Sequence, residues 1–180
     1  NLLTGVAGQI SLGHAGFLLI GAYSQAILTT DYHLSPWLAI FLSGMFSALA
    51  SLVVGVPSLR LKGLYLAITT LAFTFIVRHL VLFAEGLTHG SEGMAVVPLN
   101  VFGYAIKSDV PFFYVALIML SMFVLLTLNI IRSRIGRAWL AVRDHDIAAR
   151  AMGISLMHYK LLAFMVSAFY TGVAGSLVAL

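Results

Sequence analysis

The side chains in this sequence that could contact a polar solute lie in its glycine-rich opening segment, residues 1–16. Four glycines and three polar residues mix with the apolar residues of that segment: Gly5, Gly8, Gly13 and Gly16, with Gln9, Ser11 and His14. Amide, hydroxyl and imidazole groups exchange hydrogen bonds, and at membrane depth they need partners or water. The chemistry that they offer is recognition of a solute rather than bond breaking.

Two interpretations of this segment remain open. Glycine lets two backbones approach closely, so the segment could be a packed helix–helix seam whose polar groups are satisfied internally. It could also be a broken or re-entrant helix that borders a solute path. On the second interpretation the substrate-pathway residues are Gly8, Gln9, Ser11, Gly13 and His14.

A second group of polar residues lies in the charged stretch 137–153. Helical spacing puts Ile147, Ala148, Ala151 and Met152 on one face, and Arg143, Asp146 and Arg150 on another. This predicts a short amphipathic helix around 144–152, in which Asp144 caps the start, Asp146 and Arg150 form an i,i+4 pair, and Gly153 occupies the C′ position.

Such a helix could rest on the membrane surface with its arginines snorkelling, or it could dock into a groove on a cytoplasmic partner. The small alanines leave little apolar bulk for insertion into lipid, which favours docking. The candidate docking residues are Arg143, Asp144, Asp146, Ala148, Ala149 and Gly153.

Other kinds of chemistry are not indicated. The sequence has no cysteine, and none of its six histidines has a histidine partner at i+4, so we expect no metal site. It has no GxxxxGK[ST] run for ATP and no GxSxG or HExxH motif of a hydrolase. We therefore expect no enzymatic activity and no bound cofactor.

The elements that carry these residues are predicted to be membrane spans. Hydrophobic residues make up 61% of the chain and charged residues 9%. Because a bilayer core needs about 20 apolar residues per helix, five stretches are candidate spans: 10–29, 37–56, 63–84, 112–131 and 160–180. The predicted fold is an all-α polytopic bundle. Residues 1–180 form a single permease-like domain, which we expect to be truncated at both ends because the chain starts without Met and ends in an apolar run.

Lysine and arginine predict the orientation of the spans. They gather in 57–62 and 132–160, whereas 30–36 has none and 85–111 has only Lys107. The positive-inside rule then puts the first two connections in the cytoplasm and the other two outside. The net charge of +4 comes from lysines and arginines that gather in the predicted cytoplasmic connections. Membrane topology therefore explains these charges, and we do not expect a nucleic-acid partner. The stretch 132–159 is the cytoplasmic loop.

Four separated stretches carry a resemblance to a known family. Residues 133–153 resemble the cytoplasmic coupling region of LivM-type permeases, which belong to the branched-chain amino acid ABC importers. The stretches 1–15, 60–68 and 86–93 are similar to further motifs of that family and occur in the same order.

The resemblance implies a permease subunit in the bacterial cytoplasmic (inner) membrane. Its expected partners are a second related permease, two cytoplasmic ATPase subunits that bind the ATP, and a periplasmic or extracellular solute-binding protein. It implies alternating access for leucine, isoleucine and valine, or for urea and short amides. The external motif supplies the candidate residues Thr88, Gly90, Ser91 and Gly93, and residues 143–153 become the ATPase-coupling residues.

The alternative is a self-contained channel or secondary transporter for a small solute. Glycines within membrane spans suit it equally well. All six acidic residues lie in predicted loops or at span ends, so the predicted spans offer no carboxylate for ion coupling. The sequence therefore favours the importer.

Overall fold

The structure is a computed structural model that describes residues 2–58, 61, 63–88, 90, 94, 96–101, 104–105 and 108–180. Its helices are the π-helix η1 (Leu2–Val6), α1 (His14–Thr30), α2 (Pro36–Ser58), α3 (Leu64–Phe83), α4 (Glu85–Thr88), α5 (Asp109–Arg132), α6 (Arg134–Asp144), α7 (Asp146–Ala151) and α8 (Leu156–Ala179). Two short strands, β1 (Asn100–Val101) and β2 (Tyr104–Ala105), pair antiparallel. The all-α prediction is confirmed, since each strand of this ladder has only two residues.

The five predicted spans correspond to helices α1, α2, α3, α5 and α8. Among the described residues, four helices are long and apolar enough to cross a membrane, namely α2, α3, α5 and α8. Helix α1 has 17 residues. At 1.5 Å per residue it is about 25 Å long, which is less than the ~30 Å hydrocarbon core. It is short because the chain is not helical from residue 7 to residue 13.

Helices α1, α2 and α8 pack against one another, and α3 packs mainly against α1. The contact between α1 and α8 depends on glycine. A Cβ atom on Gly21 would overlap the carbonyl oxygen of Gly172, and one on Gly175 would overlap the carbonyl of Leu18. Van der Waals packing of small residues is a main source of helix association in membranes. Phe17 then fills the space beside this contact and meets Phe164 edge to face at 5.9 Å.

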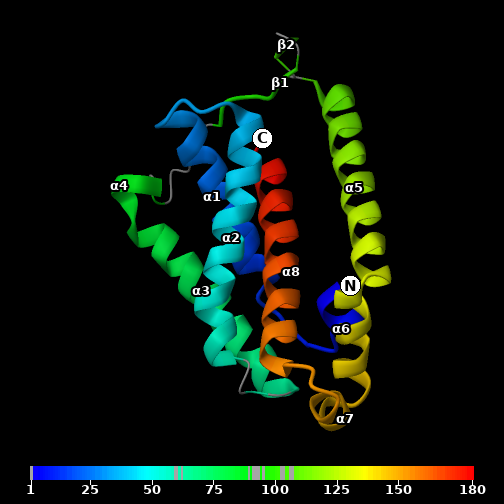
Figure 1. Ribbon diagram of the computed structural model, residues 1–180. Coiled ribbons are helices and arrows are strands. Elements are labelled where there is room, and N and C mark those ends of the chain that lie inside the picture. The colour runs from blue at the N-terminus through cyan, green and yellow to red at the C-terminus, as the bar shows by residue number, and fades with distance from the viewer. Residues whose placement is uncertain are drawn as a thin grey trace.

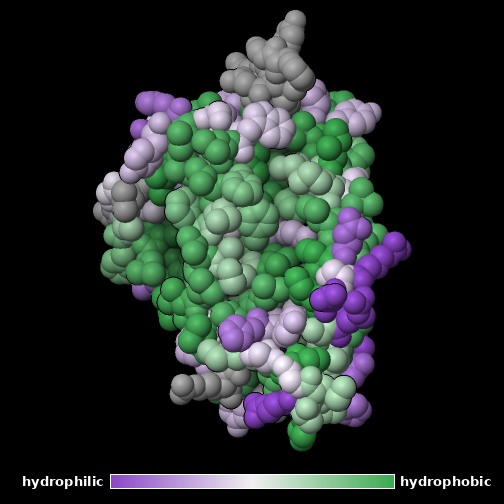
Figure 2. Space-filling view, in the orientation of Figure 1, coloured by the Kyte–Doolittle hydropathy of each residue, from purple (hydrophilic) through white to green (hydrophobic). Residues whose placement is uncertain are grey.

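Helix α5 lies to one side of this group (Figure 1) and packs mainly against α6, with no buried residue of its own. Residues of α5 and α8 line a cavity of about 570 Å³, and Phe123 of α5 contacts Phe169 and Tyr170 of α8. Apolar side chains cover the middle of the surface seen in Figure 2, whereas hydrophilic residues gather around α6 and α7. This is the distribution expected of a protein whose helices face lipid and whose basic loop faces water.

The charged loop differs from its prediction. We expected one helix around 144–152, but His145 is extended (φ −150°, ψ 93°) and divides the loop into α6 and α7. Good helix formers upstream carry α6 through to Asp144, and Trp139 fixes it to α8 by donating from Nε1 to the carbonyl of Tyr159 at 2.8 Å. Asp144 is therefore the last residue of α6 and not a cap. The N-cap of α7 is His145, which makes no side-chain capping bond.

Candidate functional site

The helix break after η1 is the first component of the candidate site. The amides of Ala7 and Gln9 donate back to the carbonyls of Leu2 and Leu3 at 3.1 and 3.0 Å, and Gly8 turns the chain with φ +67°. An L side chain rarely adopts that conformation, so glycine is required there. The backbone is thus broken within the glycine-rich segment, as one of the two interpretations expected, while the role of the break in a solute path stays a prediction.

Hydroxyl groups of α3 satisfy the non-helical backbone. Leu12 N donates to Thr70 Oγ1 at 2.9 Å, and Thr74 Oγ1 donates to the carbonyl of Leu12 at 3.4 Å. Irregular backbone at membrane depth is tolerated where protein supplies such partners. Our sequence analysis missed both threonines. Their i,i+4 spacing on one face of an apolar span was the signal that could have identified them.

Among the predicted pathway residues, Gln9 and His14 contact α8 and Gly13 contacts α3. Gln9 is buried and donates from Nε2 to the carbonyl of Lys160 at 3.2 Å, and His14 Nε2 pairs with Ser167 Oγ at 2.9 Å. Ser11 Oγ accepts from Gly13 N at 3.2 Å. A Cβ on Gly13 would lie 3.1 Å from Thr70 Cβ. The segment is therefore both a broken helix and a tight packing seam, so features of the two interpretations coexist.

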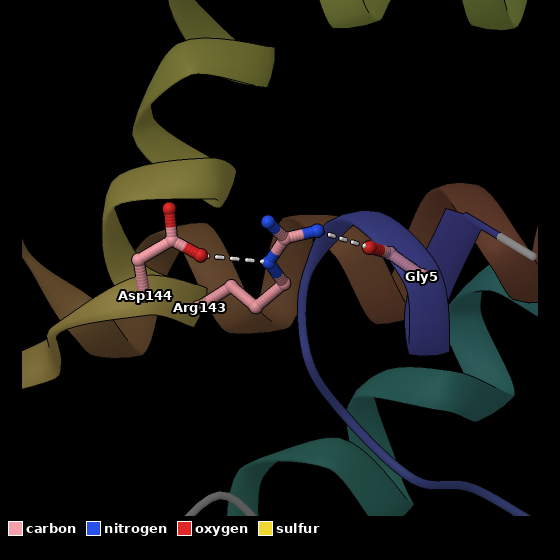
Figure 3. A network of polar contacts seen from close by, with 3 residues as sticks. All are labelled: Gly5, Arg143 and Asp144. Carbon is pink, nitrogen blue, oxygen red and sulfur yellow. Dashed lines mark hydrogen bonds and ion pairs between the residues drawn. The ribbon is translucent and has the colours of Figure 1, made fainter.

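Arg143 connects this segment to the charged loop. Its Nη1 donates to the carbonyl of Gly5 at 2.7 Å, and its Nε donates to Asp144 Oδ1 at 2.9 Å (Figure 3). A Cβ on Gly8 would lie only 2.6 Å from Arg143 Cγ, so the arginine stem covers that glycine. We predicted that Arg143 lies on a polar face offered to a partner. The structure instead turns its guanidinium toward its own chain, although its side chain keeps 40% exposure.

A cavity of about 270 Å³ lies between the opening segment and the charged loop. Residues 7–10 form one side and residues 142–146 the other, and Lys160 also borders it. The volume is slightly below the ~300–1,000 Å³ typical of sites for drug-sized ligands, so it suits water or a small solute. Arginine, lysine and aspartate in its wall provide both signs of charge, which a zwitterion could use.

Helix α7 presents part of its predicted face to the outside. Ile147 and Met152 are each 83% exposed, and Ala148 is exposed as well. Ala149 does not join them. It is buried at 4% exposure, so it packs within this chain and is not available to a groove on another protein. Neighbouring elements cover this side of the short helix, which helical spacing alone does not reveal.

Gly153 lies where the sequence predicted, whereas two residues of the predicted external motif are buried. Gly153 does occupy C′, with φ +81° and its amide donating to the carbonyl of Arg150 at 3.0 Å. Thr88 of α4 is buried and donates to the carbonyls of Val81 and Ala84, so its hydroxyl is bonded to the C-terminal end of α3. Gly90 is also buried and donates from its amide to Thr88 Oγ1 at 3.4 Å. Ser91 and Gly93 lie outside the described residues.

A metal centre finds no support in the part of the chain that the structure describes, where no group of three or more histidine or acidic residues could hold an ion. Gln9 Nε2, Leu12 N and Arg143 Nη1 are instead paired with backbone carbonyls or a hydroxyl, whereas Gln9 Oε1 is buried without a hydrogen-bond partner in the described part of the chain. The arrangement can bind and position a solute or transmit a movement between helices.

Comparison with known proteins agrees with this architecture. Residues 1–180 match the family model described as the permease component of a branched-chain amino acid transport system. The chain is 37% identical to the high-affinity branched-chain amino acid transport system permease protein LivM of Salmonella typhimurium and 36% identical to that of Escherichia coli. Each alignment covers 99% of this chain and 48% of the relative, so the chain spans about half the length of these curated relatives. No solved structure matches it. The chain belongs to the family of permease components of branched-chain amino acid transport systems.

Proposed function

We propose that this chain is part of a membrane permease subunit of an ABC importer that moves branched-chain amino acids into the cytoplasm. The observation that carries the proposal is the family match over residues 1–180, because the matched family is described as the permease component of a branched-chain amino acid transport system. The four membrane-length helices among the described residues support a location in the bacterial cytoplasmic (inner) membrane. Urea and short amides are related small solutes that such a path could also carry.

The energy source in this proposal is a separate pair of ATPase subunits. The sequence lacks the GxxxxGK[ST] loop that holds ATP phosphates, so ATP would bind to those partners. Helix α7 is the proposed docking element, since its exposed Ile147 and Met152 can enter an apolar groove while Ala148 leaves room between them. Ala149 is excluded from this surface because it is buried.

Transport would proceed by alternating access. A solute-binding protein would deliver the amino acid outside, and a second related permease would complete the path. Closure of the ATPases would move α7 and, with it, the helices around the break at Gly8. Such rocking requires two arrangements of the packed helices whose populations ATP binding shifts.

Co-purification tests the partnership. The full-length protein, tagged and extracted in mild detergent, is expected to carry an ATPase with a nucleotide-binding loop. The matched variants are Ala148→Glu, on the exposed face of α7, and Arg134→Glu, on the exposed start of α6. Loss of the ATPase only in the first is the expected result. A full-length protein that transports amino acids with no ATPase attached would favour the channel or secondary transporter instead.

A further inference from the structure

Arg143 is the only side chain in Figure 3 that spans from the cytoplasmic loop to the broken opening segment. Resting on the function proposed above, we propose that Arg143 is a positioning residue that transmits movement of the α6–α7 junction to residues 5–8. It would do so without contacting the ATPase. The proposal assigns to Arg143 a role inside the permease, where the sequence suggested a role toward a partner.

Two hydrogen bonds hold the Arg143 guanidinium between α6 and the opening segment. Asp144 accepts from Nε at 2.9 Å, which orients the group, and Nη1 then reaches the carbonyl of Gly5 at 2.7 Å. A hydrogen bond with a charged donor is about twice as strong as a neutral one. Since Asp144 is the last residue of α6, any displacement of the junction with α7 displaces this bond.

The aliphatic stem of Arg143 packs closely against Gly8. Gly8 has φ +67°, and a Cβ there would lie 2.6 Å from Arg143 Cγ and 3.2 Å from Arg143 Cβ. The stem therefore rests directly on the turn that breaks the helix. Polar attachment at Gly5 and apolar contact at Gly8 hold the two ends of the same short segment.

The 270 Å³ cavity lies beside this contact. Gly8 and Gln9 border it on one side and Arg143 and Asp144 on the other. A movement of α7 that pulls on Arg143 would alter the width of this cavity. The link would thus connect the docking helix to the space into which the solute is released.

The test uses the full-length permease reconstituted in proteoliposomes with its ATPase, second permease and binding protein. Arg143→Met keeps an apolar stem but removes the donor, and Gly8→Ala fills the space under the stem. Arg137→Ala is the matched control, because Arg137 is an exposed arginine of α6 whose Nη1 donates to the carbonyl of Arg132, outside the opening segment. The readouts are ATPase binding, ATP hydrolysis, and amino acid uptake per ATP.

For Arg143→Met we expect unchanged ATPase binding and about a ten-fold fall in uptake per ATP, since a hydrogen bond to a charged group is commonly worth that factor. Gly8→Ala should cause a comparable fall. The double variant Gly8→Ala/Arg143→Met should be no worse than the worse single variant, because both substitutions act on one contact. Arg137→Ala should behave as wild type.

Three results would overturn the inference. If Arg143→Met weakened ATPase binding while uptake per ATP stayed normal, Arg143 would be a partner contact. If Arg143→Met matched Arg137→Ala in every readout, or if its effect added fully to that of Gly8→Ala, the link would not exist. Failure of the wild-type complex to couple uptake to ATP at all would overturn the proposed function as well, so the two failures are distinguishable.

Discussion

Thr70 offers the sharpest test of how the helix break is held. It is completely buried on α3, and its Oγ1 accepts the hydrogen bond from Leu12 N at 2.9 Å. Thr70→Val keeps the shape of the side chain but leaves that amide without its partner. Interhelical hydrogen bonds in membrane proteins average about 0.6 kcal/mol and reach about 1.7 kcal/mol. We expect the free energy of unfolding to fall by an amount near the upper value, because the non-helical Leu12 amide lacks an alternative helical carbonyl.

Thr74→Val is the matched control for this prediction. It makes the same chemical change one turn further along α3, where the hydroxyl donates to the Leu12 carbonyl over a longer 3.4 Å. The free energy of unfolding should fall by about 0.6 kcal/mol or less in this variant, since a long, weak hydrogen bond to a carbonyl contributes little. The assay is the denaturation midpoint of the full-length protein in bicelles as SDS is added. Equal midpoints for both variants, or a larger loss at Thr74, would refute our account of the break.

Three further predictions concern packing, docking and topology. Gly21→Val should prevent α1 from packing on α8, because even one added carbon would overlap an α8 carbonyl, and size-exclusion chromatography should show aggregated protein. Ala149→Glu should lower the yield of folded permease because it buries a charge, whereas Ala148→Glu should insert normally but bind less ATPase. Reporters fused after His33 and after His145 should report the outside and the cytoplasm, respectively, and the reverse pattern would overturn the predicted orientation.

Hydropathy predicted the long helices well. The second span was expected at 37–56 and lies at Pro36–Ser58, and the third was expected at 63–84 and lies at Leu64–Phe83. This success has a simple cause, since lipid-facing backbone must satisfy its own hydrogen bonds and a long apolar run allows only a helix. The break near Gly8 was one of two interpretations that the sequence left open, because clustered glycines and polar residues suit both a packed seam and a broken helix.

The faces of the loop helices could not be predicted in the same way. Helical spacing sorts residues into faces, but it does not say which face meets the rest of the protein. Ala149 was therefore assigned to a docking surface although it is buried, and Arg143 was assigned to a partner although it binds the Gly5 carbonyl. Gly5 and Arg143 are 138 positions apart in the chain, so only the fold brings them together. The extended backbone at His145 likewise shifts the phase between α6 and α7.

The central claim is that this family member belongs to an ATP-driven importer of branched-chain amino acids. Its most direct test is uptake of labelled leucine by proteoliposomes that contain the full-length permease, its related permease and its ATPase, with the binding protein outside. The account predicts uptake against a gradient that requires enclosed ATP and stops when a non-hydrolysable analogue replaces it. Uptake that proceeds equally without ATP, or that runs only down the leucine gradient, would contradict the account and establish the channel or secondary transporter in its place.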